Sequence, residues 1–293
     1  MSRCSIEQAL TETALNARAG LQCLEGTPMK PPLLIQSRSN ARIQHIAALK
    51  HAKARRESQQ FLVEGMHEVA VALDTQMEIQ CIASVHDSVF SRWESQISDA
   101  VETLLVSASV FEKMSVRQHP DGVLMVCRQP TLPPVDSLPK EAGTVLVLDG
   151  LEKPGNHGAI LRTAAAFGVN AVVLNDGQID PFHPNVIRNS RGHSLRISHY
   201  RGSAETTRAV LEARGYTTCV ASPSATVELH ELKLPARCAI ILGAEHEGVS
   251  AFWEQHAAQR FRIAMIDAVD SLNVSVSASI VLYEVFKQQK LPD

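Results

Sequence analysis

The sequence has no long apolar run and no recognisable sorting signal. No stretch approaches the roughly 18 consecutive apolar residues that a membrane-spanning helix needs, and the longest candidate, 274–283, is interrupted by three serines. Residues 1–30 contain Glu7 and Glu12 and lack an apolar core that ends in a cleavage site, so they do not match a secretory or organelle-import signal. We therefore predict a cytoplasmic protein with no membrane partner, in which 1–30 is an N-terminal extension of unknown role.

Cysteine pairs and metal-ligand patterns are also missing. The six cysteines are isolated from one another, without a C-x-x-C pair or a Cys/His block of metal-ligand spacing. Glu245, His246 and Glu247 are adjacent, but their side chains alternate in an extended loop and no third ligand is apparent. We predict reduced thiols that serve mainly in packing, and no bound metal.

Basic residues are distributed unevenly along a chain whose net charge is only −3. The segment 34–60 has six bases against one acid, and 181–204 has four arginines, three histidines and no acid. One such run most often forms a solvated face, whereas two of them in an acidic chain indicate an anionic ligand. The bases of the first run are Arg38, Arg42, Lys50, Lys53, Arg55 and Arg56.

The length of 293 residues predicts about two domains, at roughly 100–200 residues each. A stretch with four prolines, 129–143, is typical of a linker and separates a domain at 31–128 from one at 144–293. In the first half, apolar spacing predicts helices near 43–49 and 69–73. The strands predicted there are 61–63, 79–85, 103–110 and 122–127.

Short apolar runs alternate with helical segments after the linker. This alternation favours an α/β fold with a mostly parallel sheet, whose ligands gather at the carboxyl ends of the strands. The predicted helices are 159–167, 204–213 and 272–287. The predicted strands are 145–148, 171–174, 217–221, 239–242 and 261–263.

Three clusters of polar residues follow these strands. In 149–164, Asn156 suits a helix cap, and Arg162 follows less than two turns later. In 242–248, two glycines flank Glu245, without the G-x-G-x-x-G of a dinucleotide site or the Gly-Lys-Ser/Thr of a phosphate loop. In 263–280, Asp270 or Ser271 suits a cap for the final helix, while the three serines at 275–279 favour close helix packing. Each cluster taken alone is also compatible with a purely structural role.

In this order and at these separations, the clusters resemble the three motifs of the SpoU (TrmH) family of RNA 2′-O-ribose methyltransferases. Arg188 to Gly192 forms a further family-like block, and 37–40 and 61–65 resemble the ribosomal-protein-like RNA-binding domain of many members. The chain departs from the usual pattern at Lys153, commonly acidic, and at Ala264, commonly proline. The pattern N-x-G-x-I-x-R-T-A is met by Asn156, Gly158, Ile160, Arg162, Thr163 and Ala164, L-G-x-E-x-x-G by Leu242, Gly243, Glu245 and Gly248, and S-L-N-V-S-V by 271–276.

The resemblance implies a carboxyl-terminal trefoil knot, a homodimer with the active site at its interface, and S-adenosylmethionine as cofactor. It also implies RNA as the partner, with ribosomal RNA favoured over transfer RNA. The cofactor-binding residues implied in this way are Leu242, Gly243, Ala244, Glu245, Gly248, Ile263, Met265, Ser271, Leu272 and Asn273.

Catalytic roles are implied for Arg162, Asn156, Glu245, Ser271 and Asn273. Because a guanidinium is effectively always protonated, we assign Arg162 to clamping an RNA phosphate and stabilising the developing alkoxide, and leave the proton acceptor unassigned. The alternatives are a tRNA methyltransferase and a catalytically silent RNA-binding protein of the same fold. The RNA contacts expected are Arg38, Arg42, Lys50, Lys53, Arg55, Arg56, Arg188 and Arg191.

Overall fold

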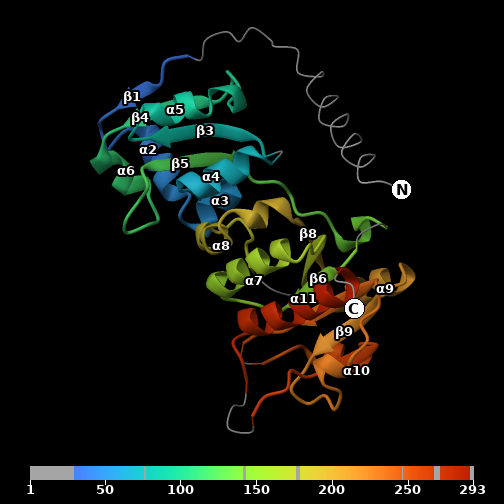
Figure 1. Ribbon diagram of the computed structural model, residues 1–293. Helices are drawn as coiled ribbons and strands as arrows, with labels where there is room; N and C mark the ends of the chain where they lie inside the picture. Colours follow the sequence, from blue (N-terminus) through green and yellow to red (C-terminus); the bar gives the residue numbers. More distant parts are fainter. Residues whose placement is uncertain are drawn as a thin grey trace, which may run out of the picture.

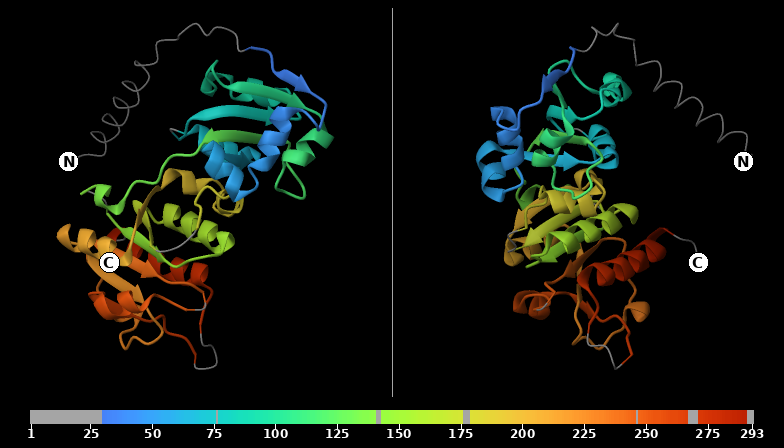
Figure 2. Two further views of the ribbon diagram at one scale, coloured as in Figure 1. Left: turned by 180° about the vertical axis from the view of Figure 1, so that it is seen from behind. Right: turned by 90° about the vertical axis from the view of Figure 1, so that its left-hand side faces the viewer.

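The computed structural model describes residues 30–75, 77–140, 143–175, 179–245, 247–266 and 271–290 (Figure 1). Apart from Lys30, the predicted N-terminal extension lies outside the described residues, as do His246 and Asp270. The described chain forms two sheets, one at each end of the molecule, with helix α8 (Pro184–Asn189) between them (Figures 1 and 2). None of the helices among these residues has the length and hydrophobicity needed to cross a bilayer.

The N-terminal sheet has five strands in the order β1-β4-β3-β5-β2, with β5 antiparallel to both of its neighbours. Its strands are β1 (Leu33–Ile35), β2 (Gln60–Glu64), β3 (Ile79–Ser84), β4 (Glu102–Val106) and β5 (Val123–Arg128). Its helices are α2 (Ala41–Ala48), α3 (Ala52–Ser58), α4 (Met66–Leu73), α5 (Ser88–Arg92), η1 (Glu94–Gln96) and α6 (Ala108–Met114).

The strand predicted at 103–110 is too long. It ends at Val106, and α6 begins two residues later. Val110, Phe111 and Met114 are buried at helical spacing and pack one face of α6 into the core. The helical period of these three residues therefore overrides the alternation that continues from β4.

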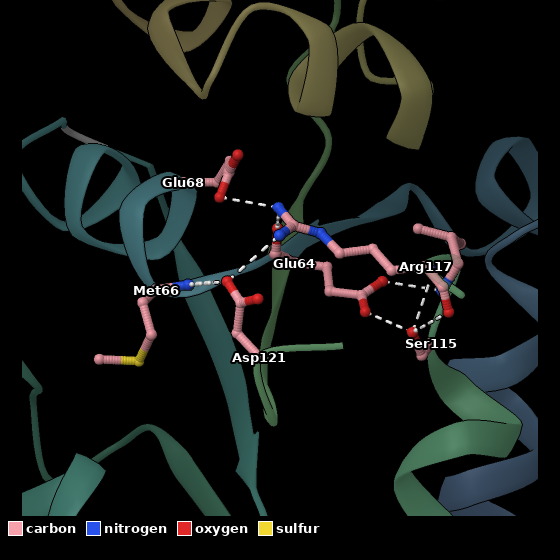
Figure 3. A network of polar contacts seen from close by, with 7 residues as sticks. Glu64, Met66, Glu68, Ser115, Arg117 and Asp121 are labelled. Atoms are coloured by element: carbon pink, nitrogen blue, oxygen red, sulfur yellow. Dashed lines mark hydrogen bonds and ion pairs between the residues drawn. The ribbon is translucent and has the colours of Figure 1, made fainter. Parts of the chain in front are cut away.

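The block 61–65 has a structural role in this domain, because Glu64 bonds to the loop that follows α6 (Figure 3). The carboxylate of Glu64 accepts hydrogen bonds from the hydroxyl of Ser115 and, at 2.7 Å, from the backbone amide of Val116. The Arg117 guanidinium forms an ion pair with Glu68 at 2.8 Å. Gly65 has φ +112°, and a Cβ atom there would overlap both members of that pair. Only glycine fits this position.

The C-terminal sheet has six strands, all parallel, in the order β11-β9-β10-β6-β7-β8. This confirms the predicted α/β class with a mostly parallel sheet. Its strands are β6 (Val145–Asp149), β7 (Ala171–Asn175), β8 (Ser198–Gly202), β9 (Thr217–Ala221), β10 (Cys238–Leu242) and β11 (Gln259–Phe261). Its helices are α7 (Pro154–Ala166), α8, η3 (His193–Arg196), α9 (Ala204–Ala213), η4 (Leu229–Glu231), α10 (Ala251–His256) and α11 (Val274–Lys290).

Helices cover both faces of this sheet. Helices α7 and α11 pack side by side on one face, where the hydroxyls of Thr163 and Ser279 lie 3.1 Å apart, and α9 and α10 cover the other (Figures 1 and 2). The central strands β6, β7 and β10 are buried along their whole length, as expected of a parallel sheet between two helical layers. The trefoil knot implied by the resemblance stays a prediction, because 267–270 in the C-terminal chain path lie outside the described residues.

The proline-rich segment 129–143 packs against the C-terminal sheet. It contains η2 (Val135–Ser137), and Val135 and Leu138 are buried in the core on the α9 side. The backbone amide of Arg201 in β8 donates to the carbonyl of Pro133 at 3.0 Å. The segment therefore follows the outer edge of β8, and the domain limits set on either side of it stay a prediction.

Candidate functional site

A cavity of about 670 Å³ lies at the carboxyl ends of the C-terminal strands. The loops after β9, β10 and β11 and the start of α11 form its wall, which is where ligands of parallel sheets bind. Its volume is within the range of small-molecule sites, about 300–1,000 Å³. Of the cofactor-binding residues implied by the sequence, every one except Asn273 lines it: Leu242, Gly243, Ala244, Glu245, Gly248, Ile263, Met265, Ser271 and Leu272.

The loop after β10 is closed on itself by backbone hydrogen bonds. The Ala244 amide donates to the Gly248 carbonyl at 2.8 Å, and the Gly248 amide donates back at 3.1 Å. A Cβ atom at Gly243 would overlap the Gly248 backbone, and Gly248 itself has φ +71°. Both glycines are therefore needed for a turn this tight, which presents Glu245 at the cavity wall.

Three motifs distant in sequence meet beside this cavity. The Asn156 amide donates to a carboxylate oxygen of Glu245 at 2.5 Å, and the Asn273 amide donates to the Asn156 side-chain oxygen at 3.3 Å. Asn273 also accepts hydrogen bonds from the amide and hydroxyl of Ser275, at 2.9 and 2.6 Å. One polar network thus joins the start of α7, the loop after β10 and the start of α11.

Two predicted helix caps are wrong. Helix α7 begins at Pro154 with Lys153 as its N-cap, so Asn156 lies inside the first turn, where its side chain is free to reach Glu245. Asn273 accepts from the Ser275 amide in the manner of an N-cap for α11, whereas Ser271 lines the cavity. Asn273 therefore both caps a helix and belongs to the network.

Arg162 lies apart from the cavity. Its side chain is exposed on α7, and it is close enough to η3 to contribute to the low pKa of His193. Of the five residues with implied catalytic roles, the structure brings Asn156, Glu245 and Asn273 into direct contact and places Ser271 on the cavity wall. Within one chain it does not bring Arg162 to that wall.

Comparison with known proteins places this arrangement in a family. Residues 143–283 match the model of the SpoU rRNA methylase family, and 40–125 match the MRM3-like substrate binding domain. An uncharacterised tRNA/rRNA methyltransferase of Synechocystis is 31% identical over 87% of this chain and 94% of its own length. The chain belongs to the SpoU methylase family. The resemblance inferred from the three motifs is confirmed.

Two further proteins extend the comparison. The 23S rRNA (guanosine(2553)-2′-O)-methyltransferase RlmP of Bacillus subtilis is 28% identical, over 86% of this chain and 98% of its own. The crystal structure of an AdoMet-bound rRNA methyltransferase from Sinorhizobium meliloti superposes with a TM-score of 0.81. That alignment covers 90% of this chain and 100% of the other at 24% identity, and it supports the two-domain SpoU fold.

Sequence reasoning missed one side of the cavity. Ser222, Ser224 and Glu228, from the loop after β9, line it together with Arg262. Arg262 forms an ion pair with Glu228 at 2.9 Å that ties this loop to the end of β11. The position of this loop in the sequence could have predicted its role. The loop directly follows a predicted strand, and the carboxyl ends of these strands form the ligand-binding edge of the sheet.

Seven of the eight predicted RNA contacts lie at least partly at the surface. Arg42 forms an ion pair with Glu102 at 2.7 Å, Lys53 pairs with Glu57 at 3.8 Å, and Lys50 is partly buried and donates to the Lys113 carbonyl. The other four, Arg38, Arg56, Arg188 and Arg191, are exposed.

The prediction for Arg55 is wrong. Its side chain is 1% exposed, and Nε and Nη2 donate to a carboxylate oxygen of Asp180 at 2.9 and 2.7 Å. Its Nη1 donates to the carbonyls of Leu49 and Lys50, both at 3.0 Å. Arg55 therefore joins the two domains and has no free donor face for RNA.

No group of three or more His, Cys, Asp or Glu side chains placed to hold a metal is present within the described ranges. The four cysteines there, Cys81, Cys127, Cys219 and Cys238, are free and buried. Burial raises the pKa of the Cys127 thiol to about 12, which keeps it protonated at neutral pH.

Proposed function

We propose that this protein transfers the methyl group of S-adenosylmethionine to a ribose 2′-hydroxyl of ribosomal RNA. The observation that carries the proposal is the meeting of Asn156, Glu245 and Asn273 in one hydrogen-bonded network beside the cavity. The similarity to a 23S rRNA 2′-O-methyltransferase of Bacillus subtilis supports 23S rRNA as the substrate, and transfer RNA is the alternative. We also place the protein in the cytoplasm, where it has access to RNA during ribosome assembly.

The residues of the cavity fit S-adenosylmethionine. The volume suits a ligand of this size, and the tight loop at 243–248 lets backbone come close to it. Its wall carries four carboxylates and one guanidinium, which favours a positively charged sulfonium. When bound, the cofactor supplies an electrophilic methyl group.

The polar side chains then align the ribose and stabilise charge. Asn156 and Asn273 hold Glu245 in one orientation, so that its carboxylate is preorganised to accept a hydrogen bond from the substrate. Ser271 offers a hydroxyl on the same wall. Alignment of this kind is worth up to about 7–11 kcal/mol in well-oriented systems. Arg162 binds the phosphate next to the target ribose and stabilises the developing alkoxide.

A homodimer accounts for the position of Arg162. Val276, Ile280 and Tyr283 are 46%, 38% and 49% exposed at i, i+4 and i+7, so α11 presents an apolar stripe to solvent. Thr163, the residue after Arg162, bonds to Ser279 on α11, so Arg162 lies on the helix that packs beside the one that carries this stripe. A second copy docked on the stripe would bring the two active sites to the interface.

The substrate is tested by mapping ribose methylation in total RNA from cells with and without the gene. One 23S rRNA nucleotide should lose its 2′-O-methyl group, and purified protein should restore it on an unmodified transcript. Loss of methylation only in a transfer RNA would favour the alternative substrate. An unchanged methylation map would favour a catalytically silent protein.

The role of Arg162 is tested by single-turnover methyl transfer with enzyme in excess, which removes product release from the measurement. Arg162→Ala should slow transfer by about 100-fold or more and leave cofactor affinity unchanged. Arg162→Lys should rescue little, because a point charge does not reproduce the planar fork. Arg208→Ala on α9, at the opposite face of the sheet, is the matched control. Wild-type transfer by the alanine variant would refute the assignment.

A further inference from the structure

The junction between the domains carries basic side chains that the cofactor cavity does not use. Resting on the proposed function, we propose that His67 and His193 form, with Arg162 and Arg191, one binding site for an RNA phosphate. His67 belongs to the N-terminal domain, and the other three belong to the C-terminal domain. The N-terminal domain would therefore contribute a side chain next to Arg162, in addition to its own basic surface.

The two domains are packed together at this junction. Phe61 of β2 and Phe182 pack with their ring centroids 4.9 Å apart, in a core that also includes Ile187 and Leu195. The ion pair between buried Arg55 and partly exposed Asp180 joins the same surfaces. Helix α8 accordingly lies against the N-terminal sheet in all views (Figures 1 and 2). The two halves of the proposed site are thus held in a fixed relation.

The backbone brings η3 directly against α4. Gly192 has φ +80°, and a Cβ atom there would lie 3.1 Å from Val71 and 3.2 Å from the Cα of Glu68. A Cβ atom at this position would be closer to α4 than ordinary van der Waals contact allows. The close approach sets the ring centroids of His67 and His193 5.9 Å apart, edge to face, with His67 exposed to solvent.

Arg191 adopts a backbone conformation that arginine rarely takes. Its φ is +52°, and only Gln59 shares a positive φ among the non-glycine residues that the structure describes. A non-glycine residue in this region costs about 1 kcal/mol or more. Ser190 turns inward and bonds to Ser194 at 2.9 Å, so the strained turn leaves the Arg191 side chain in solvent. A glycine would hold the turn without strain, so the arginine is better explained by its charge.

The charges around His193 are mostly positive. Burial and four neighbouring cationic or basic groups lower its pKa, namely Arg196, His67, Arg162 and Arg191. Two acids, one on α4 and one directly after it, already have partners: Glu68 pairs with Arg117 (Figure 3), and Asp74 pairs with Arg196 at 2.9 Å. A phosphate would fill the anionic position in this cluster and raise the pKa of His193 again. His193 should therefore take up a proton when RNA binds.

Because RNA binding and protonation of His193 are coupled, the pH dependence of RNA affinity tests the site. A purely structural role of His193 would not change that pH dependence. Affinity for an unmodified 23S rRNA transcript should rise as pH falls from 8 to 6. His193→Gln should weaken binding about tenfold at pH 6 and flatten the pH dependence, as expected when a hydrogen bond to a charged group is lost. His67→Gln should also weaken binding, and the double variant should show less than the sum of the two effects. His256→Gln on α10 is the matched control.

Arg191→Gly separates binding from folding, because it removes the cation and relieves the left-handed strain. Its melting temperature should equal or exceed that of the wild type, while the slope of log affinity against log salt falls by about 1. Cofactor affinity should not change in any variant. Weaker RNA binding by the histidine variants, with no methylation of the transcript by the wild type, would support the phosphate site and reject only the 23S rRNA substrate. RNA affinity and pH dependence equal to wild type in both histidine variants would overturn the site.

Discussion

Two neighbouring histidines inside the C-terminal domain should make its stability depend on pH. His157 lies on α7 between Asn156 and Gly158, and His199 lies on β8. The centroids of the two rings are 6.3 Å apart. Burial lowers the pKa of His157 to about 3 and that of His199 to about 4. Neither nitrogen of His157, nor Nε2 of His199, has a hydrogen-bond partner among the described residues. Both rings therefore stay neutral in the folded protein at pH 5.

The size of the effect follows from proton linkage. In the unfolded chain both histidines titrate near a pKa of about 6.5. Because the folded values are lower, the full stability is present above pH 6.5 and is lost as pH falls toward the folded values. Each histidine contributes about 1.4 kcal/mol per pH unit, so a drop from pH 6.5 to 5 costs about 2 kcal/mol per ring and about 4 for the pair. This is a large share of the roughly 5–15 kcal/mol that stabilises a domain.

Urea unfolding at pH 7.5 and 5.0 measures this loss. Trp93→Phe leaves Trp253, fully buried under the C-terminal sheet, as the only tryptophan, so its fluorescence reports the relevant domain. Replacing both His157 and His199 by leucine should remove about 4 kcal/mol of the pH dependence. His256→Gln at an exposed site should remove none. The reasoning is refuted if the leucine double variant loses as much stability between the two pH values as the wild type.

Three further predictions concern the junction, the N-terminal domain and the proposed dimer. Asp180→Asn should lower the free energy of unfolding by about 3 kcal/mol, measured in urea, because it leaves the Arg55 guanidinium buried without its counter-charge. The exposed pair of Arg208 and Glu212 provides the control. A loss below about 0.5 kcal/mol in Asp180→Asn would contradict the prediction. Gly65→Ala should cost at least about 1 kcal/mol, since its φ of +112° and its contact with the Arg117 ion pair both exclude a side chain; an unchanged melting temperature would show that the turn adapts. Ile280→Glu should convert a dimer to a monomer in sedimentation at micromolar concentration, and a dimer that persists would place the interface elsewhere.

The C-terminal sheet was largely predictable because its central strands are buried on both faces. Such strands are apolar along their whole length, as at 145–148 and 171–174, and stand out from the sequence around them. Strand β8 was missed because it lies at the edge of the sheet and its sequence, SHYRG, is polar. It is held in the sheet by backbone hydrogen bonds to β7, which do not depend on side-chain type and so cannot be predicted from its composition.

The motifs likewise predicted which residues form the site but not the contacts between them. The spacing of glycines and polar residues in three clusters predicted the family, and the cavity wall contains nearly all of the residues that the family implies. The contacts between them could not be predicted, since Asn156 and Glu245 are 89 positions apart and Asn156 and Asn273 are 117 apart. The sequence also allowed Asn156 to cap α7, and the position of Pro154 decided against it.

Local sequence therefore determined the apolar strands, the tight glycine turns and the chemical types of the functional side chains, because these depend on residues that are close neighbours in the chain. The tertiary structure alone decided which charges remain available to a ligand. Arg55 is one of six bases in a basic run, yet it is buried against Asp180, 125 positions away. His67 and His193 are not notable in the sequence, yet the docked domains place them beside each other. Burial and long-range pairing set the charge that a surface presents, and neither can be read from the order of residues along the chain.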